Sequence, residues 1–119
     1  MDKKLKDSLL KIKLLICDID GVLTDGSFIK STSGEELRSF NALDGVGFVV
    51  LRLLDLNVKT AWITGRESIT TTQRAEELQI DDVYNGVIRK IDAYNELKKK
   101  YELSDSEVCF IGDDIIDIP

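Results

Sequence analysis

Histidine is absent from the sequence, proline occurs once and cysteine occurs twice. Without histidine, this chain cannot build a Ser-His-Asp triad, a Cys-His dyad or a histidine-ligated metal site. Cys17 and Cys109 are too few for a zinc cluster or a disulfide scaffold, and they indicate a reducing compartment. No apolar run approaches the ~18 residues that a membrane-spanning helix needs. These absences together favour a soluble domain in the cytoplasm.

The charge and the apolar content narrow the class further. The 22 acidic and 16 basic residues give a formal net charge of −6, so neither nucleic acid nor an anionic membrane is expected as a partner. Apolar residues make up 43% of the 119 positions, which is enough to bury one core. Because the sequence shows no repeat and no linker-like stretch, we expect a single domain over residues 1–119.

Short apolar runs alternate with helical patterns along the chain. The runs that we expect to be strands are Lys13–Cys17, Val58–Ile63, Val83–Tyr84 and Val108–Ile111. Helices are predicted over residues 44–56, over 68–79 and from Asp92 to about Tyr101, and a hairpin is predicted from Val22–Ile29 and Glu35–Phe40. The alternation predicts an α/β fold, with a doubly wound, Rossmann-like parallel sheet and a β-hairpin inserted after strand one.

Polar residues cluster where three of these strands end. They are Asp18 and Asp20 after the first strand, Thr64, Gly65 and Arg66 after the second, and Asp113, Asp114 and Asp117 after the fourth. In a parallel sheet the ligand crevice lies beyond the carboxyl ends of the strands, so we expect these groups to meet there. Several carboxylates at one rim repel each other unless a cation neutralises them, and oxygen ligands favour Mg²⁺.

A hydroxyl, a backbone N–H and a mobile cation beside such acids suit a phosphoryl group. Thr64 offers the hydroxyl, Gly65 the N–H, and Lys90, after the third strand, the cation. Taken one at a time, these residues have ordinary explanations, because a strand-end aspartate often forms a turn or caps a helix and a lone lysine is usually solvated. Four polar clusters at one rim favour the phosphoryl site.

The residues of these clusters carry a resemblance to a known family. The segment Asp18–Gly26 resembles the first motif of the haloacid dehalogenase superfamily of phosphohydrolases. Thr64, Lys90 and residues 112–117 resemble its second, third and fourth motifs, in the right order. Within the superfamily, the chain resembles the small, cap-less phosphatases of 3-deoxy-D-manno-octulosonate 8-phosphate (KDO 8-phosphate). The subgroup features are residues 21–26, 40–45, 63–66, 85–86 and 112–119.

The resemblance implies a role for each site residue. Asp18 would attack phosphorus and form an aspartyl-phosphate, and Asp20 would act as general acid and then as general base. Mg²⁺ would be held by the carboxylates of Asp18 and Asp113 and by the backbone carbonyl of Asp20. The remaining groups would assist: Thr64, Gly65 and Lys90 would hold the phosphoryl oxygens, Asp114 and Asp117 would support the metal ligands, and Arg66 would reach the substrate carboxylate or lie as a surface arginine at a helix start.

The resemblance also implies partners and an extent. The expected substrate is a small acidic sugar phosphate, KDO 8-phosphate, from lipopolysaccharide precursor synthesis. The hairpin over residues 22–40 resembles the element that joins neighbouring subunits in the family, so we expect a homotetramer. Family members continue beyond the last motif, whereas this sequence ends at Pro119. We therefore expect a C-terminally truncated domain in which strand four is an exposed edge.

Three other functions compete with this hypothesis. The first is a phosphatase of a related nonulosonate 9-phosphate. Phosphatases of that kind usually resemble one another in having a glutamate at the position where this chain has Arg66. The second is a non-catalytic oligomerisation module of the same fold. The third is a phospho-acceptor receiver domain, which we reject because strand three is followed by Asn85 and Gly86 rather than by an acidic residue.

Overall fold

A four-stranded parallel sheet forms the centre of the molecule in the computed structural model, which describes residues 1–113. The strands lie in the order β5-β4-β1-β6, and every neighbouring pair is parallel. Their bounds are β1 Leu14–Cys17, β4 Lys59–Ile63, β5 Asp82–Tyr84 and β6 Val108–Ile111. This arrangement confirms the predicted α/β class and the doubly wound order, because the chain moves outward from β1 to β5 and then returns to the other side of β1.

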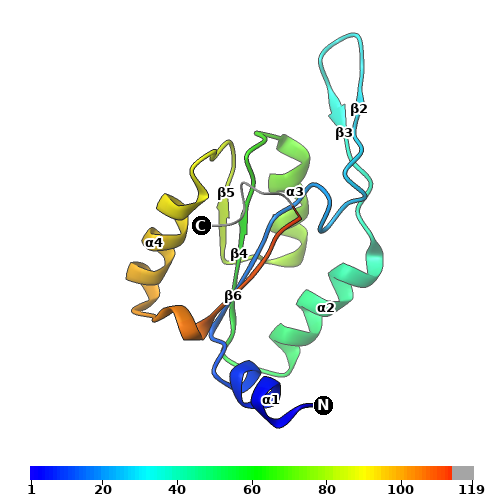
Figure 1. Cartoon of the computed structure of the whole chain (residues 1–119). Helices are drawn as coiled ribbons and strands as arrows, with labels where there is room; N and C mark the ends of the chain where they lie inside the picture. Colours follow the sequence, from blue (N-terminus) through cyan, green and yellow to red (C-terminus); the bar gives the residue numbers. More distant parts are fainter. Residues whose placement is uncertain (114–119) are drawn as a thin grey trace.

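Helices cover both faces of the sheet (Figure 1). The helices are α1 Lys3–Leu10, α2 Ala42–Leu53, α3 Ile69–Leu78 and α4 Lys90–Tyr101, and a short 3-10 helix, η1 Asp105–Glu107, leads into β6. Phe48 of α2 and Leu78 of α3 share one buried cluster, whereas Leu97 of α4 belongs to a second. The two clusters therefore lie on opposite faces of the sheet. Within residues 1–113, no helix is long and apolar enough to cross a membrane.

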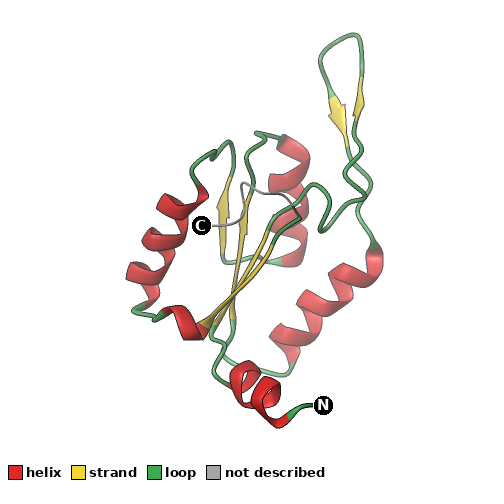
Figure 2. Cartoon of the chain, viewed as in Figure 1, coloured by secondary structure: helices red, strands yellow, loops and turns green. Residues whose placement is uncertain are grey.

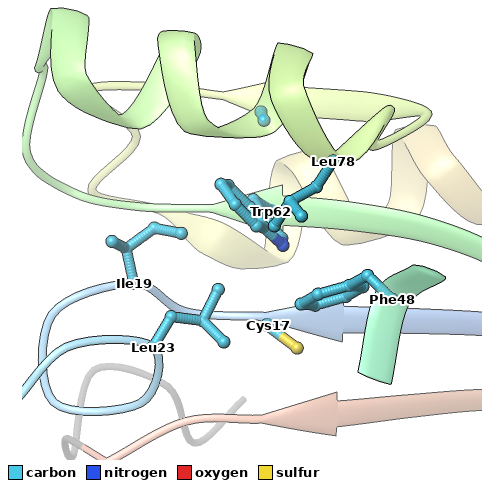
Figure 3. Packing of buried hydrophobic residues seen from close by; sticks show 7 residues of the cluster. Cys17, Ile19, Leu23, Phe48, Trp62 and Leu78 are labelled. Atoms are coloured by element: carbon cyan, nitrogen blue, oxygen red, sulfur yellow. The ribbon is translucent and has the colours of Figure 1, made fainter. Parts of the chain in front are cut away.

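The alternation of side chains along β1 explains the two clusters. Leu14 and Ile16 face α4, while Cys17 faces α2 and α3, because successive residues of a strand point to opposite faces. Trp62 of β4 is fully buried in the α2–α3 cluster, with its ring 5.7 Å from the ring of Phe48 in an edge-on arrangement. Figure 3 shows this packing around Trp62. The core thus fixes β1 and β4, the two strands that are followed by the predicted polar residues Asp18 and Thr64.

The hairpin after β1 projects away from the sheet (Figure 2). Its strands are short, β2 Ile29–Lys30 and β3 Glu36–Leu37, and they pair antiparallel. The hairpin was predicted to have longer arms, over Val22–Ile29 and Glu35–Phe40. The arms are shorter because residues 19–24 form a turn in which the N–H groups of Val22, Leu23 and Thr24 all donate to the carbonyl of Ile19.

Two helix starts differ from the sequence prediction. The pattern predicts a helix that starts at Asp44, but α2 begins at Ala42 because the side chain of Asn41 accepts a hydrogen bond from the Leu43 N–H at 2.8 Å. The pattern places the third predicted helix at Asp92, but α4 begins at Lys90. The second difference matters for the site, because it puts Lys90 in the first turn of a packed helix. The N-terminal helix α1 was not predicted, and none of its residues is buried.

Two glycines in α2 lie in different surroundings. A Cβ at Gly45 would lie 2.7 Å from Nη2 of Arg74 and 3.3 Å from Cδ2 of Leu78, whereas a Cβ at Gly47 would meet no atom within 4 Å. We expect Gly47→Ala to raise the free energy of unfolding by about 0.5–1 kcal/mol, since alanine is the better helix former. Gly45→Ala should gain nothing or lose stability. Urea unfolding of both variants tests this, and equal gains would contradict the close approach of Arg74.

Cys17 is 2% exposed, and burial, reinforced by the negative charges of Cys109, Asp44 and Asp18, raises the pKa of its thiol to about 12. At pH 8 its thiolate fraction in the folded chain is therefore roughly 1,000-fold below that of an ordinary cysteine. In a Cys109→Ser background, we expect alkylation of Cys17 at pH 8 to be at least about 100-fold slower in the folded chain than in urea. Raising the pH towards 10 should speed both reactions and narrow the gap by about tenfold or more, because the thiol in urea is then almost fully ionised while the buried thiol still gains about tenfold in thiolate per pH unit. Similar rates at pH 8 would show that Cys17 is accessible.

Candidate active site

A cleft of about 480 Å³ opens beyond the carboxyl ends of the strands, a volume typical of small-molecule sites. Its lining contains every sequence-predicted site residue that the structure describes: Asp18, Asp20, Thr64, Gly65, Arg66, Lys90 and Asp113. Gly26 and Ile88 complete the lining. A larger cleft of about 610 Å³ lies between the hairpin and the start of α3, and it contains none of the predicted residues. Asp114 and Asp117 lie outside the described residues.

Asp18 and Lys90 form a buried ion pair at the floor of the cleft. Asp18 follows β1, and its backbone N–H donates to the carbonyl of Ile111 at 2.9 Å, which continues the pairing of β1 with β6. Its Oδ1 accepts the N–H of Ile19 at 2.7 Å and lies 3.2 Å from Nζ of Lys90. The two side chains are 9% and 5% exposed. A carboxylate this far from water needs a compensating charge, and Lys90 supplies it.

Thr64 directly follows β4, and its backbone N–H and carbonyl are both hydrogen-bonded. Its N–H donates to the carbonyl of Tyr84, and its carbonyl accepts the N–H of Val87, each at 2.9 Å. Its hydroxyl oxygen accepts the N–H of Arg66 at 3.3 Å. Because that contact uses the oxygen as an acceptor, the hydroxyl proton can be donated to a bound oxygen. The side chain is 2% exposed, so its position is fixed by packing.

Asp113 packs against the loop that follows β1. Gly21 in that loop has φ +87°, and a Cβ there would lie 1.7 Å from Oδ2 of Asp113. The carboxylate of Asp113 therefore occupies the space that any other side chain at position 21 would fill. This contact joins the ends of β1 and β6 at the cleft. Asp18 and Asp113 thus present carboxylates to one cavity.

This set of donors suits a hard divalent cation. Mg²⁺ commonly takes one or two carboxylates, completes its shell with water and binds substrate phosphate. Among residues 1–113, no group of three or more His, Cys, Asp and Glu side chains is placed to hold a metal. The ligand set that the resemblance implies consists of two carboxylates and one backbone carbonyl. It has fewer side chains than such a group, and it leaves positions for water and substrate.

Arg38 binds Asp20, and sequence reasoning missed it. Nε of Arg38 donates to Oδ1 of Asp20 at 2.9 Å, and Nη1 donates to Oγ of Ser68 at 2.7 Å. The Arg38 side chain is 1% exposed. The available signal was the alternation of Glu36, Arg38 and Phe40, which puts a charged side chain on the same side of an extended segment as an aromatic one. The partners of Arg38 come from elsewhere in the chain and leave no local pattern.

Ser68 is the first residue of the helix predicted over residues 68–79, a position that suits a capping serine. It does occupy the N-cap position of α3, but its side chain makes no capping hydrogen bond. Its hydroxyl instead contacts Arg38 and Thr70. The residue was therefore placed correctly, while its hydroxyl contributes to the network around Asp20.

Arg66 lies at the mouth of the cleft and is held by the hairpin. Its guanidinium carbon is 3.8 Å from the centre of the Phe28 ring, and Nη2 is 3.3 Å from Oε1 of Glu36. The side chain is 39% exposed. Arg66 is thus partly open to a ligand while its orientation is restrained on two sides.

Gly21 and Gly34 offer a matched test of the Asp113 contact. Both have positive φ, +87° and +91°, but a Cβ at Gly34 would meet no atom within 4 Å. Replacement by alanine should cost each position about 1–2 kcal/mol of stability from the backbone alone. Gly21→Ala must also displace Asp113, so we expect a larger loss in urea unfolding and weaker Mg²⁺ binding by calorimetry. Equal losses of stability and of Mg²⁺ binding in Gly21→Ala and Gly34→Ala would contradict the contact between Gly21 and Asp113 and the place of Asp113 in the site.

No family model matches the chain. The crystal structure of 3-deoxy-D-manno-octulosonate 8-phosphate phosphatase from Moraxella catarrhalis, in complex with a magnesium ion, a phosphate ion and KDO, is similar with a TM-score of 0.92 and 34% identity. The match covers 99% of this chain and 67% of that one. The chain belongs to the KDO 8-phosphate phosphatase family. The resemblance that the motifs carry is thereby confirmed.

Two further proteins are similar to this chain, one a curated phosphatase of the same name and one a solved structure of the wider superfamily. The curated KDO 8-phosphate phosphatase from Yersinia pestis is 44% identical over 108 residues, which are 91% of this chain and 57% of the relative. A structure from Legionella pneumophila, described as a hydrolase of HAD superfamily subfamily III A, has a TM-score of 0.88 at 41% identity and covers 96% of this chain and 64% of that one. The chain spans just over half the length of the curated phosphatase that it matches.

Proposed function

We propose that the chain is a Mg²⁺-dependent phosphomonoesterase that hydrolyses KDO 8-phosphate to KDO and phosphate. The observation that carries the proposal is the buried Asp18–Lys90 pair, with its 3.2 Å contact, in the same cleft as Thr64 and Asp113. A nucleophilic carboxylate, a cation and a hydroxyl donor around one cavity suit phosphoryl transfer, in which positioning and charge supply most of the catalysis. The Moraxella relative, which binds magnesium, phosphate and KDO, supports the same chemistry.

The proposed reaction has two steps that use the two carboxyl groups in turn. An oxygen of Asp18 attacks phosphorus, the bond from phosphorus to the sugar oxygen breaks, and Asp20 gives its proton to the leaving alkoxide. The product on the chain is an aspartyl-phosphate. A water molecule then attacks phosphorus while Asp20 takes its proton, and the bond to Asp18 breaks to release phosphate. Both side chains line the cleft, and both are regenerated.

The phosphoryl oxygens are held by groups from two strand ends and one helix start. Thr64 donates its hydroxyl proton, Gly65 its backbone N–H, and Lys90 places its ammonium beside Asp18. The buried position of Lys90, 5% exposed, means that its charge is weakly screened by solvent. These three residues therefore hold the transferring group while Asp18 is aligned for attack.

The carboxylates of Asp18 and Asp113 and the backbone carbonyl of Asp20 would hold Mg²⁺. The fit rests on Gly21, whose missing side chain leaves the space that the Asp113 carboxylate fills. The ion, when bound, offsets the repulsion between the phosphoryl group and the attacking carboxylate. Asp114 and Asp117 are proposed to orient these ligands through hydrogen bonds.

Arg66 is proposed to receive the carboxylate of the sugar acid. It lies at the cleft mouth on the Phe28 ring, with a side chain that is 39% exposed. An arginine binds a carboxylate through two parallel hydrogen bonds, which favours an acidic sugar over a neutral one. The same feature leaves a nonulosonate 9-phosphate as the alternative substrate, because that sugar also carries a carboxylate.

The proposal includes an assembly and a cellular setting. The projecting hairpin exposes Phe28, Ile29 and Leu37, which supports packing against a neighbouring copy in a homotetramer. Cys17 and Cys109 are free thiols, which supports a reducing cytoplasmic location and a place in lipopolysaccharide precursor synthesis.

Phosphate release from KDO 8-phosphate, with and without Mg²⁺, tests the proposal. We expect release only with Mg²⁺, and we expect Asp18→Asn to lower it by at least about 1,000-fold, because asparagine cannot act as the nucleophile. Asp7→Asn, which changes an exposed carboxylate on α1, should leave the rate unchanged. A folded, oligomeric chain that binds no Mg²⁺ and releases no phosphate would instead identify a non-catalytic module.

A further inference from the structure

Arg38 is a deeply buried arginine that binds Asp20 of the cleft lining, and it contacts three separate parts of the chain. Its side chain, 1% exposed, lies just beyond the hairpin strand β3. One nitrogen binds Asp20 in the loop after β1, and another binds Ser68 at the start of α3. Nη1 also lies 3.4 Å from Oε2 of Glu36 in the hairpin. Such a residue determines how these three segments lie relative to one another.

The contacts use the shape of the guanidinium group. Nε donates to Asp20 at 2.9 Å while Nη1 donates to Ser68 at 2.7 Å, so the planar group is fixed at two points. A lysine has one nitrogen and cannot make both contacts in the same geometry. Among the described residues, Nη2 of Arg38 is buried without a hydrogen-bond partner. A buried donor of this kind lowers stability, so the arginine is not explained by stability alone.

The contact selects one oxygen of the Asp20 carboxyl group. Arg38 donates to Oδ1, so when Asp20 is protonated the proton belongs on Oδ2, because Oδ1 already accepts a hydrogen bond from a cation. The Asp20 side chain is 27% exposed and lines the cleft. An acid that lines the cavity, and whose contact with Arg38 uses Oδ1, has Oδ2 left to give a proton to a leaving group there.

We propose that Arg38 is the positioning residue of the acid–base group, holding Asp20 so that Oδ2 meets the leaving oxygen of the phosphate ester. This inference rests on the proposed function. It also gives the hairpin a part in the reaction, because Glu36 contacts both Arg38 and Arg66. The base of the hairpin thus connects the group that protonates the leaving oxygen with the group proposed to bind the sugar carboxylate.

The need for a positioned acid depends on the leaving group. A sugar alkoxide is a strong base, with a conjugate-acid pKa of roughly 14 or above, and it must be protonated as it leaves. A p-nitrophenolate ion, with a conjugate-acid pKa of about 7, leaves without a proton. The ratio kcat/KM reports only the steps up to departure of the first product, so it isolates the acid role of Asp20 from its later role as a base.

The experiment compares kcat/KM for KDO 8-phosphate and for p-nitrophenyl phosphate in the wild-type chain, Arg38→Met and Arg38→Lys. We expect Arg38→Met to lose about 100-fold on the sugar phosphate and less than about 3-fold on the aryl phosphate. Arg38→Lys should recover part of the loss, since it keeps a charge near Asp20. Asp20→Asn serves as the benchmark and should show the same imbalance between the two esters.

The ratio of the two losses separates positioning from folding. A variant that is partly unfolded loses both activities equally, so misfolding cannot produce the imbalance. Arg74→Met is the matched control, because Arg74 pairs with Glu77 at 3.0 Å on α3 and does not line the cleft. It should leave the ratio unchanged.

Two results would overturn the inference in distinguishable ways. Equal losses on the two esters in Arg38→Met, with an active wild-type chain, would reduce Arg38 to a structural residue and leave the proposed function standing. A wild-type chain that hydrolyses neither ester with Mg²⁺ present would overturn the proposed function and the inference with it.

Discussion

The parallel pairing of β1 with both β4 and β6 is the constraint on which the site depends. Leu14 is opposite Lys59 on one side and Val108 on the other, so the three strands run in step and finish at the same rim. Each strand end then delivers one kind of group: Asp18 from β1, Thr64 from β4 and Asp113 from β6. No side-chain contact has to bring these groups together, because backbone hydrogen bonds already do so.

The rim that results is acidic, and the chain balances it with buried cations from outside the three strands. Lys90 enters from the first turn of α4 and Arg38 enters from the segment after β3. Each binds a different aspartate, Lys90 binding Asp18 and Arg38 binding Asp20. Two neighbouring carboxyl groups therefore have different surroundings, one in a nearly dry pair and one at the edge of solvent. Such a difference is what two carboxyl groups need if they are to take different roles.

Much of this could be predicted from the sequence, because the strongest signals are local. Short apolar runs predict the buried strands. Once these strands are taken as parallel, the polar groups at their carboxyl ends are expected at the same edge of the sheet. The start of α2 lies two residues before the predicted start at Asp44, because Asn41 caps the helix. Arg38 was missed for a different reason: its partners, Asp20 and Ser68, are 18 and 30 residues away, and no spacing rule relates them.

The interlock between Gly21 and Asp113 has a thermodynamic consequence for the whole chain. Asp18 and Asp113 are 95 residues apart in the sequence, and the parallel pairing of β1 with β6 brings them to one cavity. A collapsed intermediate lacking β6 would have half of a site. Any ligand that bridges the two carboxylates therefore binds the native state and not its precursors, and by mass action it would raise the melting temperature of the entire domain rather than of one loop.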